Sequence, residues 1–420
     1  MTKTKIRIHL LFIDSLRALA AIYVVIHHSV LQYYDDSFFP YKSIKDYHFS
    51  ALKTNTLSLF LFGTYAVDLF IVVSGFSLML SVTKNRHLLK GGVEEFFKRR
   101  IIRILPPYYI AMLFSILLIW LFVGEKTDSH WDVSIPISLK DVVYHTFLIH
   151  DFFTSKVDYV NHAFWSIAVE FRIYLFFPLL VLIWRKFGAL PVVFFSIFIS
   201  ITGTLLLIYF KRYYPDIRFG TGVSPYIILF TFGMLAADLA FSESRAAIAL
   251  RKFYYKVPSI IIILVIIGIY FVARTSRHAI DHINNPYMNE IGLAEKVVDV
   301  FLGVIFSLVL FVFSLSYKGK NTFNFLVKLL SWKPLIFIGT FSYSLYLIHS
   351  PLVALLSQYA IVPLHLDRFE SCVVQIVVGT PIIIFISYGF FYLFERPFLT
   401  MGKKMTPLLI EEEVVINPAA

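Results

Sequence analysis

The chain has 420 residues, of which 58% are hydrophobic and 15% charged, and its mean hydropathy is +0.75. A soluble domain of this length would not carry such a composition or 44 phenylalanines, so the sequence predicts an integral membrane protein and excludes the soluble globular classes. The net charge of +11 arises largely in segments predicted to face anionic lipid, so we expect no nucleic-acid partner. The single cysteine, Cys372, excludes an internal disulfide and provides no metal motif, and we expect no metal ion.

Ten apolar runs are long enough to cross a hydrocarbon core of roughly 30 Å. They predict an all-α polytopic membrane protein with about ten transmembrane helices. One domain is expected over residues 1–400, followed by a short tail at 401–420. The predicted spans are 15–31, 57–81, 104–123, 164–184, 190–210, 224–241, 257–272, 297–316, 335–356 and 373–394.

Lys and Arg residues predict the side on which each loop lies, because loops retained in the cytoplasm carry the excess. With a cytoplasmic N-terminus, the inside segments hold 23 of the 38 basic residues and the outside loops hold 13. Both termini are therefore predicted to be cytoplasmic. Loop 211–223 fits least well, because it places three basic residues outside, and one span could be gained or lost there.

Two ionisable residues of the first span, Arg17 and His28, lie eleven positions apart. At 3.6 residues per turn they return to one face, roughly 16 Å apart, whereas His27 is rotated by about 80°. Each has a simpler explanation: Arg17 could extend to the cytoplasmic interface beside Asp14, and His28 could bond to a neighbouring helix. Together on one face they favour a function, because ionisable groups within a span are costly and usually line a polar interior.

Three of the ionisable residues in later spans are further candidates: Asp68, Glu170 and His349. Counted from the predicted helix ends, Glu170 and His349 lie in the outer half of the bilayer with His28, and Asp68 lies nearer the middle. Similar depth would allow Glu170 and His349 to act with His28. Structural roles stay open: Glu170 could bond to Tyr174 at i+4, and Asp68 fits a structural carboxylate better than a functional one.

A basic cluster precedes the third span, which is predicted to open at Pro106 and Pro107. Arg100 and Arg103 are three positions apart on one helical face, and paired guanidinium groups suit phosphate oxygens. Physical reasoning alone favours an anchor for lipid head groups. A phosphate-bearing cofactor is the alternative.

Two other segments have open readings. In the second span, Ser74 and Gly75 permit close helix packing or the close approach of a ligand, and packing is the favoured reading. In the outside loop 124–163, the stretch 141–153 is apolar and aromatic but too short to span. It is expected either to lie in the interface or to fold back over a cavity.

These segments, taken in order, resemble the acyltransferase 3 family of membrane-bound acyltransferases over nearly the whole chain. The first match carries Arg17 and His28 at the family's R-x10-H spacing, and the third carries Arg100 and Arg103 as its R-x-x-R pair. The matching stretches are IDSLRALAAIYVVIHHS at 13–29, DLFIVVSGF at 68–76, KRRIIRILPPYY at 98–109, HAFWSIAVEFRIYLFFP at 162–178, FSYSLYLIHSP at 341–351 and ERPF at 395–398.

The resemblance implies ten helices, a cytoplasmic acyl-CoA donor, usually acetyl-CoA, and an acceptor hydroxyl on an extracytoplasmic or lipid-linked glycan. In the family the R-x10-H pair is required for acyl transfer and the R-x-x-R pair is associated with the CoA donor. By position these roles fall on Arg17 with His28 and on Arg100 with Arg103. Some members carry an extra SGNH-type esterase domain, and we expect none here because few residues follow the tenth span.

The chemistry suggests a role for each residue, because a thioester donor needs a base for the acceptor hydroxyl and a site for the CoA phosphates. We predict His28 as that base or as a transient acyl carrier, with Glu170 orienting it and Arg17 reaching toward the donor. Arg100 and Arg103 are predicted to bind the phosphates. The supporting candidates are His349, Asp68, Ser74 and Tyr343.

The predicted function is O-acetylation of a bacterial surface glycan, such as O-antigen or exopolysaccharide, by a multi-pass enzyme of the inner (plasma) membrane. The expected partners are the lipid bilayer, acyl-CoA and a glycan or glycolipid acceptor. The alternative is a proton-coupled transporter or flippase of lipid-linked sugars, with His28, Glu170 and Asp68 as a relay. That alternative gives Arg100 and Arg103 no specific role and predicts internal repeats that we do not find.

Overall fold

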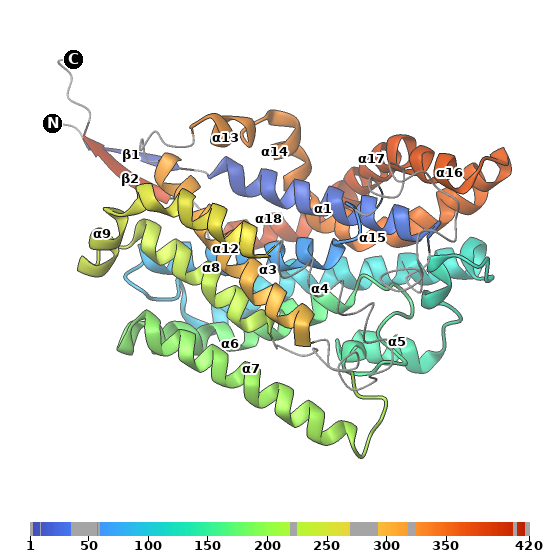
Figure 1. Ribbon diagram of the computed structural model, residues 1–420, viewed down its shortest axis with the longest axis horizontal. Coiled ribbons are helices and arrows are strands. Elements are labelled where there is room, and N and C mark those ends of the chain that lie inside the picture. The colour runs from blue at the N-terminus through green and yellow to red at the C-terminus, as the bar shows by residue number, and fades with distance from the viewer. Residues whose placement is uncertain are drawn as a thin grey trace.

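The computed structural model describes residues 3–8, 10–34, 57, 59–218, 225–268, 293–317, 324–405 and 410–415, and these are almost entirely helical (Figure 1). Two strands, β1 (Lys3–Ile8) and β2 (Ile410–Val415), pair with each other. The helices are α1 (Leu11–Leu31), α3 (Gly63–Lys84), α4 (Gly92–Leu118), α5 (Leu139–Thr146), α6 (Trp165–Phe187), α7 (Ala189–Lys211), α8 (Tyr226–Phe241), α9 (Arg245–Arg251), α12 (Leu293–Tyr317), α13 (Asn324–Leu329), α14 (Lys333–Thr340), α15 (Ser342–Leu356), α16 (Arg368–Val374), α17 (Thr380–Phe390) and α18 (Arg396–Met405).

Short turns of other helix types join or extend these elements. Turns of 3-10 helix lie at His130–Ser134, His150–Phe152, Tyr254–Lys256 and Val362–Leu364. Turns of π-helix continue α4, α15, α16 and α17, at Ile119–Val123, Ser357–Ile361, Gln375–Gly379 and Phe391–Glu395 respectively.

The described residues confirm an all-α polytopic membrane protein. Eight of their helical segments are long and apolar enough to cross a membrane, and a ninth is added if α8 and α9, bent by 86°, form one broken span. A shorter apolar helix, Tyr254–Gly268, covers most of the predicted seventh span, and residues 269–272 lie outside the described residues. Each predicted span therefore coincides with an apolar helix.

Several predicted helix boundaries were wrong. The second span begins at Gly63 rather than at 57, and α4 begins at Gly92 and runs through both prolines that were predicted to open it. Proline is tolerated inside a transmembrane helix. Beside these prolines, the Tyr343 hydroxyl donates to the Ile104 carbonyl oxygen at 3.0 Å.

Near the C-terminus the helix boundaries also differ from the predicted ones. The segment predicted as one span at 335–356 is divided at Phe341 into α14 and α15, and the membrane-length helix is Ser342–Leu364. The last span runs from Arg368 to Met401, so the predicted domain limit at residue 400 falls inside α18.

The two ends of the bundle carry different loops. β1 and β2 are antiparallel, so the two termini lie together at one end (Figure 1). At the other end, loop 124–163 meets the loop after α7, because the Thr154 amide donates to the Asp216 carbonyl oxygen at 2.8 Å. The described part of loop 211–223, residues 211–218, thus lies on the same side as loop 124–163, as predicted. The cytoplasmic assignment of the termini stays a prediction.

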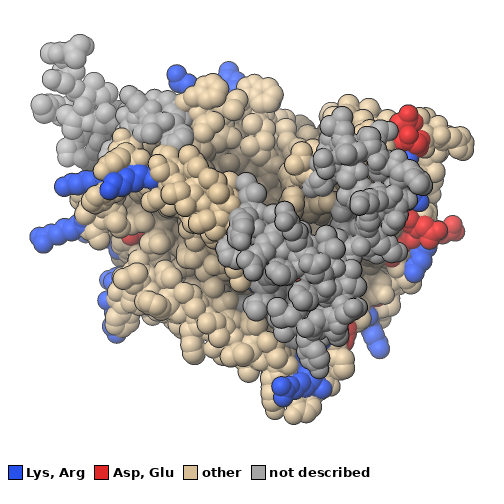
Figure 2. Space-filling view, in the orientation of Figure 1, with Lys and Arg blue, Asp and Glu red and all other residues tan. Residues whose placement is uncertain are grey.

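The periphery of the bundle is apolar. Much of the face in Figure 2 is free of charge, with Lys and Arg toward its margins. Helix α7, at the edge of the bundle in Figure 1, exposes a large apolar side chain at every third or fourth position, the spacing of one helix face. A stripe of this kind suits contact with lipid. Its members are Leu190, Phe194, Phe198, Ile201 and Leu205.

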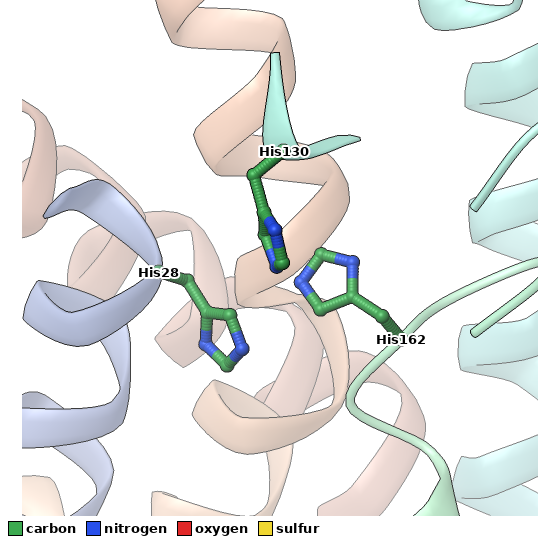
Figure 3. Close-up of side chains that lie close together, drawn as sticks. All are labelled: His28, His130 and His162. Carbon is green, nitrogen blue, oxygen red and sulfur yellow. The ribbon is translucent and has the colours of Figure 1, made fainter. Parts of the chain in front are cut away.

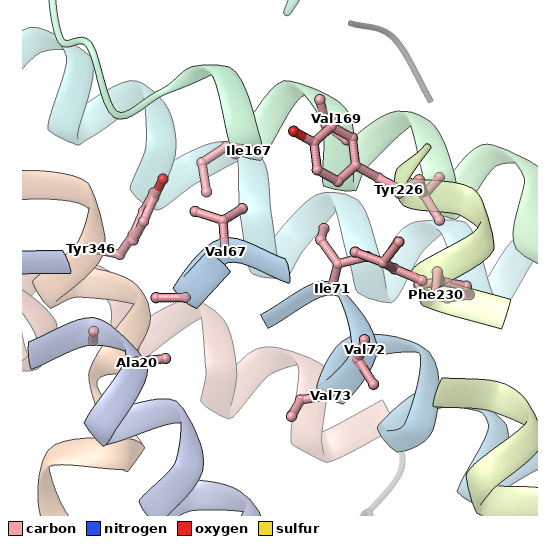
Figure 4. Close-up of a cluster of buried hydrophobic side chains, with 14 of the residues drawn as sticks. Ala20, Val67, Ile71, Val72, Val73, Ile167, Val169, Tyr226, Phe230 and Tyr346 are labelled. Atoms are coloured by element: carbon pink, nitrogen blue, oxygen red, sulfur yellow. The ribbon is translucent and has the colours of Figure 1, made fainter. Parts of the chain in front are cut away.

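The core is built around α3, which packs closely against α8 through two glycines. A Cβ atom at Gly75 would lie 2.0 Å from the Phe230 carbonyl oxygen, and one at Gly233 would lie 2.0 Å from the Val72 carbonyl oxygen. Small residues allow two membrane helices to approach in this way. Figure 4 shows the buried apolar side chains around this contact. The predicted packing role is confirmed for Gly75.

Gly75→Ala should destabilise the protein, because the new methyl group meets a backbone oxygen and α3 and α8 must separate. We expect the free energy of unfolding to fall by about 1–3 kcal/mol, which lowers the midpoint of thermal unfolding in detergent. Gly203→Ala in α7 is the control: a Cβ atom there has nothing within 4 Å. It should leave the midpoint unchanged or raise it. Equal midpoints for the two variants would contradict the close packing.

Candidate active site

Histidines from helix α15 and from loop 124–163 surround His28 near the C-terminal end of α1. The ring centroid of His28 lies 4.9 Å from that of His349 in α15, 4.7 Å from that of His162 and 5.9 Å from that of His130. His130 opens the turn His130–Ser134, and His162 precedes α6. Figure 3 shows His28, His130 and His162 facing one another. We call these four residues the histidine cluster.

Hydrogen bonds fix the tautomers of His349 and His28. The Nδ1 atom of His349 lies 2.7 Å from the Tyr346 carbonyl oxygen, which only accepts, so Nδ1 carries the proton. In the neutral ring, Nε2 of His349 is then an acceptor, 2.9 Å from Nδ1 of His28. Nδ1 of His28 also lies 3.0 Å from the Val24 carbonyl oxygen, so it too bears a proton. The lone pair of His28 is therefore on Nε2, where a base needs it.

The two loop histidines are buried. His162 is 7% exposed, and its Nδ1 atom lies 3.0 Å from Ser134 Oγ. Its Nε2 atom has no hydrogen-bond partner among the described residues. Burial, followed by the neighbouring His130 and His349, lowers the pKa of His162 well below its ordinary value. His162 is therefore neutral at physiological pH.

Loop 124–163 is held over this end of the bundle by contacts with α4 and α6. The Tyr108 hydroxyl donates to the His145 carbonyl oxygen at 3.0 Å, and the Tyr109 hydroxyl donates to that of Thr146 at 2.9 Å. From α6, Arg172 pairs with Asp151. Stretch 141–153 thus folds back against α4 and α6.

A second polar layer lies deeper in the bundle and joins three helices. Nη2 of Arg17 donates to Ser77 Oγ at 2.9 Å, and its Nη1 lies 3.4 Å from Asp14 Oδ1. Ser74 Oγ donates to Glu170 Oε1 at 2.9 Å. Tyr174 also donates to Glu170, as its i+4 spacing predicted. Arg17, Ser74 and Glu170 thus belong to one neighbourhood.

The depth predicted for Glu170 was wrong. Helix α3 runs past α1 with Gly63 beside His27 and Ser77 beside Arg17. Ser74, the partner of Glu170, is eleven residues from Gly63 and three from Ser77, so it lies roughly 16 Å from the level of His27 but only about 4.5 Å from that of Ser77.

Glu170 therefore lies near Arg17, and no hydrogen bond within the described ranges joins it to His28. The depth count failed because the segment before α6 is itself folded into the bundle. Asn161, which is fully buried, donates to the Leu347 carbonyl oxygen at 3.0 Å, and His162 is already level with His28.

Arg100 and Arg103 reach the same deep layer from α4. Both are half-buried, and neither forms an ion pair in the part of the chain that the structure describes. Arg103 is close enough to Arg17, Arg100 and Glu395 to interact with each electrostatically. Their neighbour Arg99 differs, because it pairs with a carboxylate of its own helix. Arg100 and Arg103 thus place two guanidinium groups that form no ion pair among the described residues near that of Arg17. Such an arrangement can bind an anion.

The remaining candidates have structural partners. Tyr343 bonds to α4 beside the prolines, and Glu395 of the ERPF stretch accepts from the backbone amide and the hydroxyl of Ser344. Asp68 is 1% exposed and interacts with Lys296 and Asp299 of α12. No hydrogen bond among the described residues joins Asp68 to His28 or Glu170.

His28 of the R-x10-H pair thus lies in the histidine cluster. Arg17 of that pair lies in the deeper polar layer, near Arg100 and Arg103 of the R-x-x-R pair. A sequence model described as an acyltransferase domain matches residues 10–394. The chain belongs to this family.

The chain is similar to curated members of this acyltransferase family. It is 26% identical over 416 residues to the O-acetyltransferase OatA of Staphylococcus aureus, covering 93% of this chain and 57% of that protein. It is 25% identical over 363 residues to the peptidoglycan O-acetyltransferase OatA of Listeria monocytogenes, covering 82% of this chain and 49% of that protein. The chain thus spans about half the length of these relatives. No solved structure matches it.

The sequence did not predict several of the polar residues that lie inside this acyltransferase domain. His130 and His162 are polar residues of a loop, and a span-by-span search for buried charge passes over them. His162 opens one of the matching stretches, which was the available signal. Lys296 and Asp299 were placed in a loop and a span respectively, so their pairing at 3.0 Å was not anticipated.

The loop over the histidine cluster should lose stability in acid. Burial lowers the pKa of His145 to about 4. In an unfolded segment the pKa of this histidine is near 6.5, so the unfolded state takes up the proton first as the pH falls. The free energy of opening the loop is therefore greatest above pH 6.5 and falls as the pH drops toward 4, by up to about 3 kcal/mol. Hydrogen exchange of peptides from 139–163, corrected for the intrinsic rate, should rise in this window.

His145→Asn is the control, because asparagine keeps an N–H for the Asp141 carbonyl oxygen that His145 now bonds, but does not titrate. The variant should show a flatter pH profile than the wild type. Identical profiles would show that protonation of His145 does not open the loop.

Proposed function

We propose that the chain is a membrane-bound O-acyltransferase that moves an acyl group, acetyl in the first instance, from acyl-CoA to a hydroxyl of a glycan. One observation carries the proposal. An imidazole whose proton is held on Nδ1, leaving Nε2 as a base, stands on the same helix face as an arginine that lies among guanidinium groups without carboxylate partners. Family membership and the names of the relatives agree with this chemistry.

The donor is proposed to bind at the deep layer. Arg100 and Arg103 would bind the phosphates of CoA, and Arg17 would lie beside the arm that leads toward His28. The eleven positions from Arg17 to His28 correspond to roughly 16 Å along α1, comparable with the length of a pantetheine arm. The thioester would then reach the histidine cluster while the nucleotide stays at the other level.

The proposed reaction is direct transfer. Nε2 of His28 takes the proton of the acceptor hydroxyl as its oxygen attacks the thioester carbon. The new C–O bond forms, the C–S bond breaks, and the CoA thiolate receives the proton from Nε2. His349 accepts the hydrogen bond from Nδ1 of His28 and so stabilises the imidazolium that forms between the two proton transfers.

The acceptor is proposed to approach from the end of the bundle that carries loop 124–163, because His130 and His162 of that loop flank His28. The sequence suggested O-antigen or exopolysaccharide, whereas the Listeria relative is named for peptidoglycan. Peptidoglycan therefore joins the proposed acceptors. An extracytoplasmic glycan and the plasma membrane are common to all of them.

The transporter alternative is less well supported. It uses His28, Glu170 and Asp68 as one relay for protons, and no hydrogen bond among the described residues links any two of the three. It also leaves the guanidinium groups of Arg100 and Arg103 unexplained.

His28→Ala should lower acetyl transfer, measured as free CoA released from acetyl-CoA with a glycan acceptor in nanodiscs, by at least about 100-fold. Binding of CoA should persist, because the nucleotide site lies at the other level. His365→Asn, at an exposed residue with a positive φ that asparagine tolerates, is the control and should keep full activity. Wild-type rates in His28→Ala would remove the mechanism.

Arg100→Gln and Arg103→Gln should each raise KM for acetyl-CoA by about 10-fold or more, because each removes a charge-assisted hydrogen bond to phosphate. Arg99→Gln is the control on the same helix, since Arg99 pairs with Glu95. Acetyl-pantetheine, which lacks the nucleotide phosphates, should be used equally well by the wild type and both variants. A lipid anchor would instead make all three variants behave alike.

A further inference from the structure

We propose that His28, His130 and His162 form a binding site for a transition-metal ion of the zinc class, and that occupation of this site inhibits the enzyme. The binding part stands on geometry alone, and the inhibitory part rests on the proposed role of His28 as a base. Sequence motifs gave no hint of a metal, because the three ligands come from segments that are far apart in the chain.

The spacing of the three rings suits one ion. One ring nitrogen from each residue lies within 4.8 Å of those of the other two, and this is the one such group found among the described residues. Zinc–nitrogen bonds of about 2.0–2.1 Å in a tetrahedron require nitrogens about 3.4 Å apart. Closing the three nitrogens onto an ion therefore takes shifts of about an ångström, within the range of small rotations of the rings.

The outer hydrogen bonds are those of metal-binding histidines, which commonly donate the second ring N–H to a carbonyl or another polar group. Nδ1 of His28 donates to the Val24 carbonyl oxygen and faces Nε2 of His349. Nδ1 of His162 lies against Ser134 Oγ. With both Nδ1 atoms engaged, Nε2 of each ring is the ligand atom.

The burial of His162 adds a second observation. His162 is only 7% exposed, yet its Nε2 atom has no hydrogen-bond partner among the described residues. A buried polar atom without a partner destabilises the folded state, and a metal bond would remove that cost. Figure 3 shows the His162 ring turned toward His28 and His130.

The ligand set selects the class of ion. Three imidazoles suit zinc, cobalt, nickel or copper, whereas magnesium and calcium prefer oxygen ligands. Three protein ligands also leave a fourth position for water, as in catalytic rather than structural zinc sites.

Inhibition follows from the single lone pair on Nε2 of His28. This lone pair either takes the proton of the acceptor hydroxyl or binds the metal, and it cannot do both. Zinc at this site should therefore compete with catalysis. The same loop that places His130 and His162 beside the base would make the enzyme sensitive to free metal.

The test separates binding from activity. Protein purified in detergent and stripped of metal by a chelator is titrated with Co²⁺, whose visible absorption reports a site with few, mostly nitrogen ligands. The wild type should bind one Co²⁺ with a visible band that Zn²⁺ displaces. His162→Gln and His130→Gln should each weaken binding at least about 10-fold, and His365→Asn should not. Thermal unfolding of each variant checks that it is folded.

Zn²⁺ is then added to the CoA-release assay. Half-inhibition should occur near the zinc concentration that displaces half of the Co²⁺. No band in the wild type, or an unchanged band in both folded variants, overturns the site. Binding without inhibition overturns the inhibitory part. Zinc-dependent activity would overturn it too and would also exclude His28 as a free base. If the chain has no transferase activity, the absorption titration still decides the metal site.

Discussion

The arrangement depends on one constraint: a polar group buried in a membrane protein must find its partner within the protein. Because an unpaired buried group is energetically costly, ionisable residues of different helices lie together in shared layers. Arg17 is held by Ser77, Glu170 by Ser74, and His28 by His349, each across a helix interface. These bonds set the relative heights of α1, α3, α6 and α15 in a bundle whose lipid-facing side chains are interchangeable apolar groups.

Helix α1 then acts as a spacer of fixed length between two layers with different chemistry. The deep layer contains Arg100 and Arg103, which form no ion pair among the described residues, so it suits an anion. The layer at the other end of that spacer is built of imidazole rings, which can accept and donate protons. A donor with phosphates at one end and a thioester at the other fits this separation. Glu170, at the deep level, is better placed to balance the charge of Arg17 and Arg100 than to orient His28.

The sequence predicted what depends on composition and local spacing. The spans, the shared face of Arg17 and His28, and the bonds of Arg17 to Asp14 and of Tyr174 to Glu170 all follow from hydropathy or helix geometry. It could not predict what depends on the path of a loop. His130 and His162 reach His28 only because loop 124–163 folds back onto α4 and α6, and that fold is held by contacts between distant residues. The error in the depth of Glu170 has the same cause.

Helix α4 connects the two layers physically. It carries Arg100 and Arg103 near one end and, one to two turns later, Tyr108 and Tyr109, which hold the loop over His28. Pro106 and Pro107 lie between them and lack the amides that would bond to the preceding turn, so the helix is weakest against bending at that point. Tyr343 braces the same turn from α15, the helix that also carries His349. A change in the bend of α4 would therefore move Arg100 and Arg103, the loop histidines and His349, the partner of His28, together.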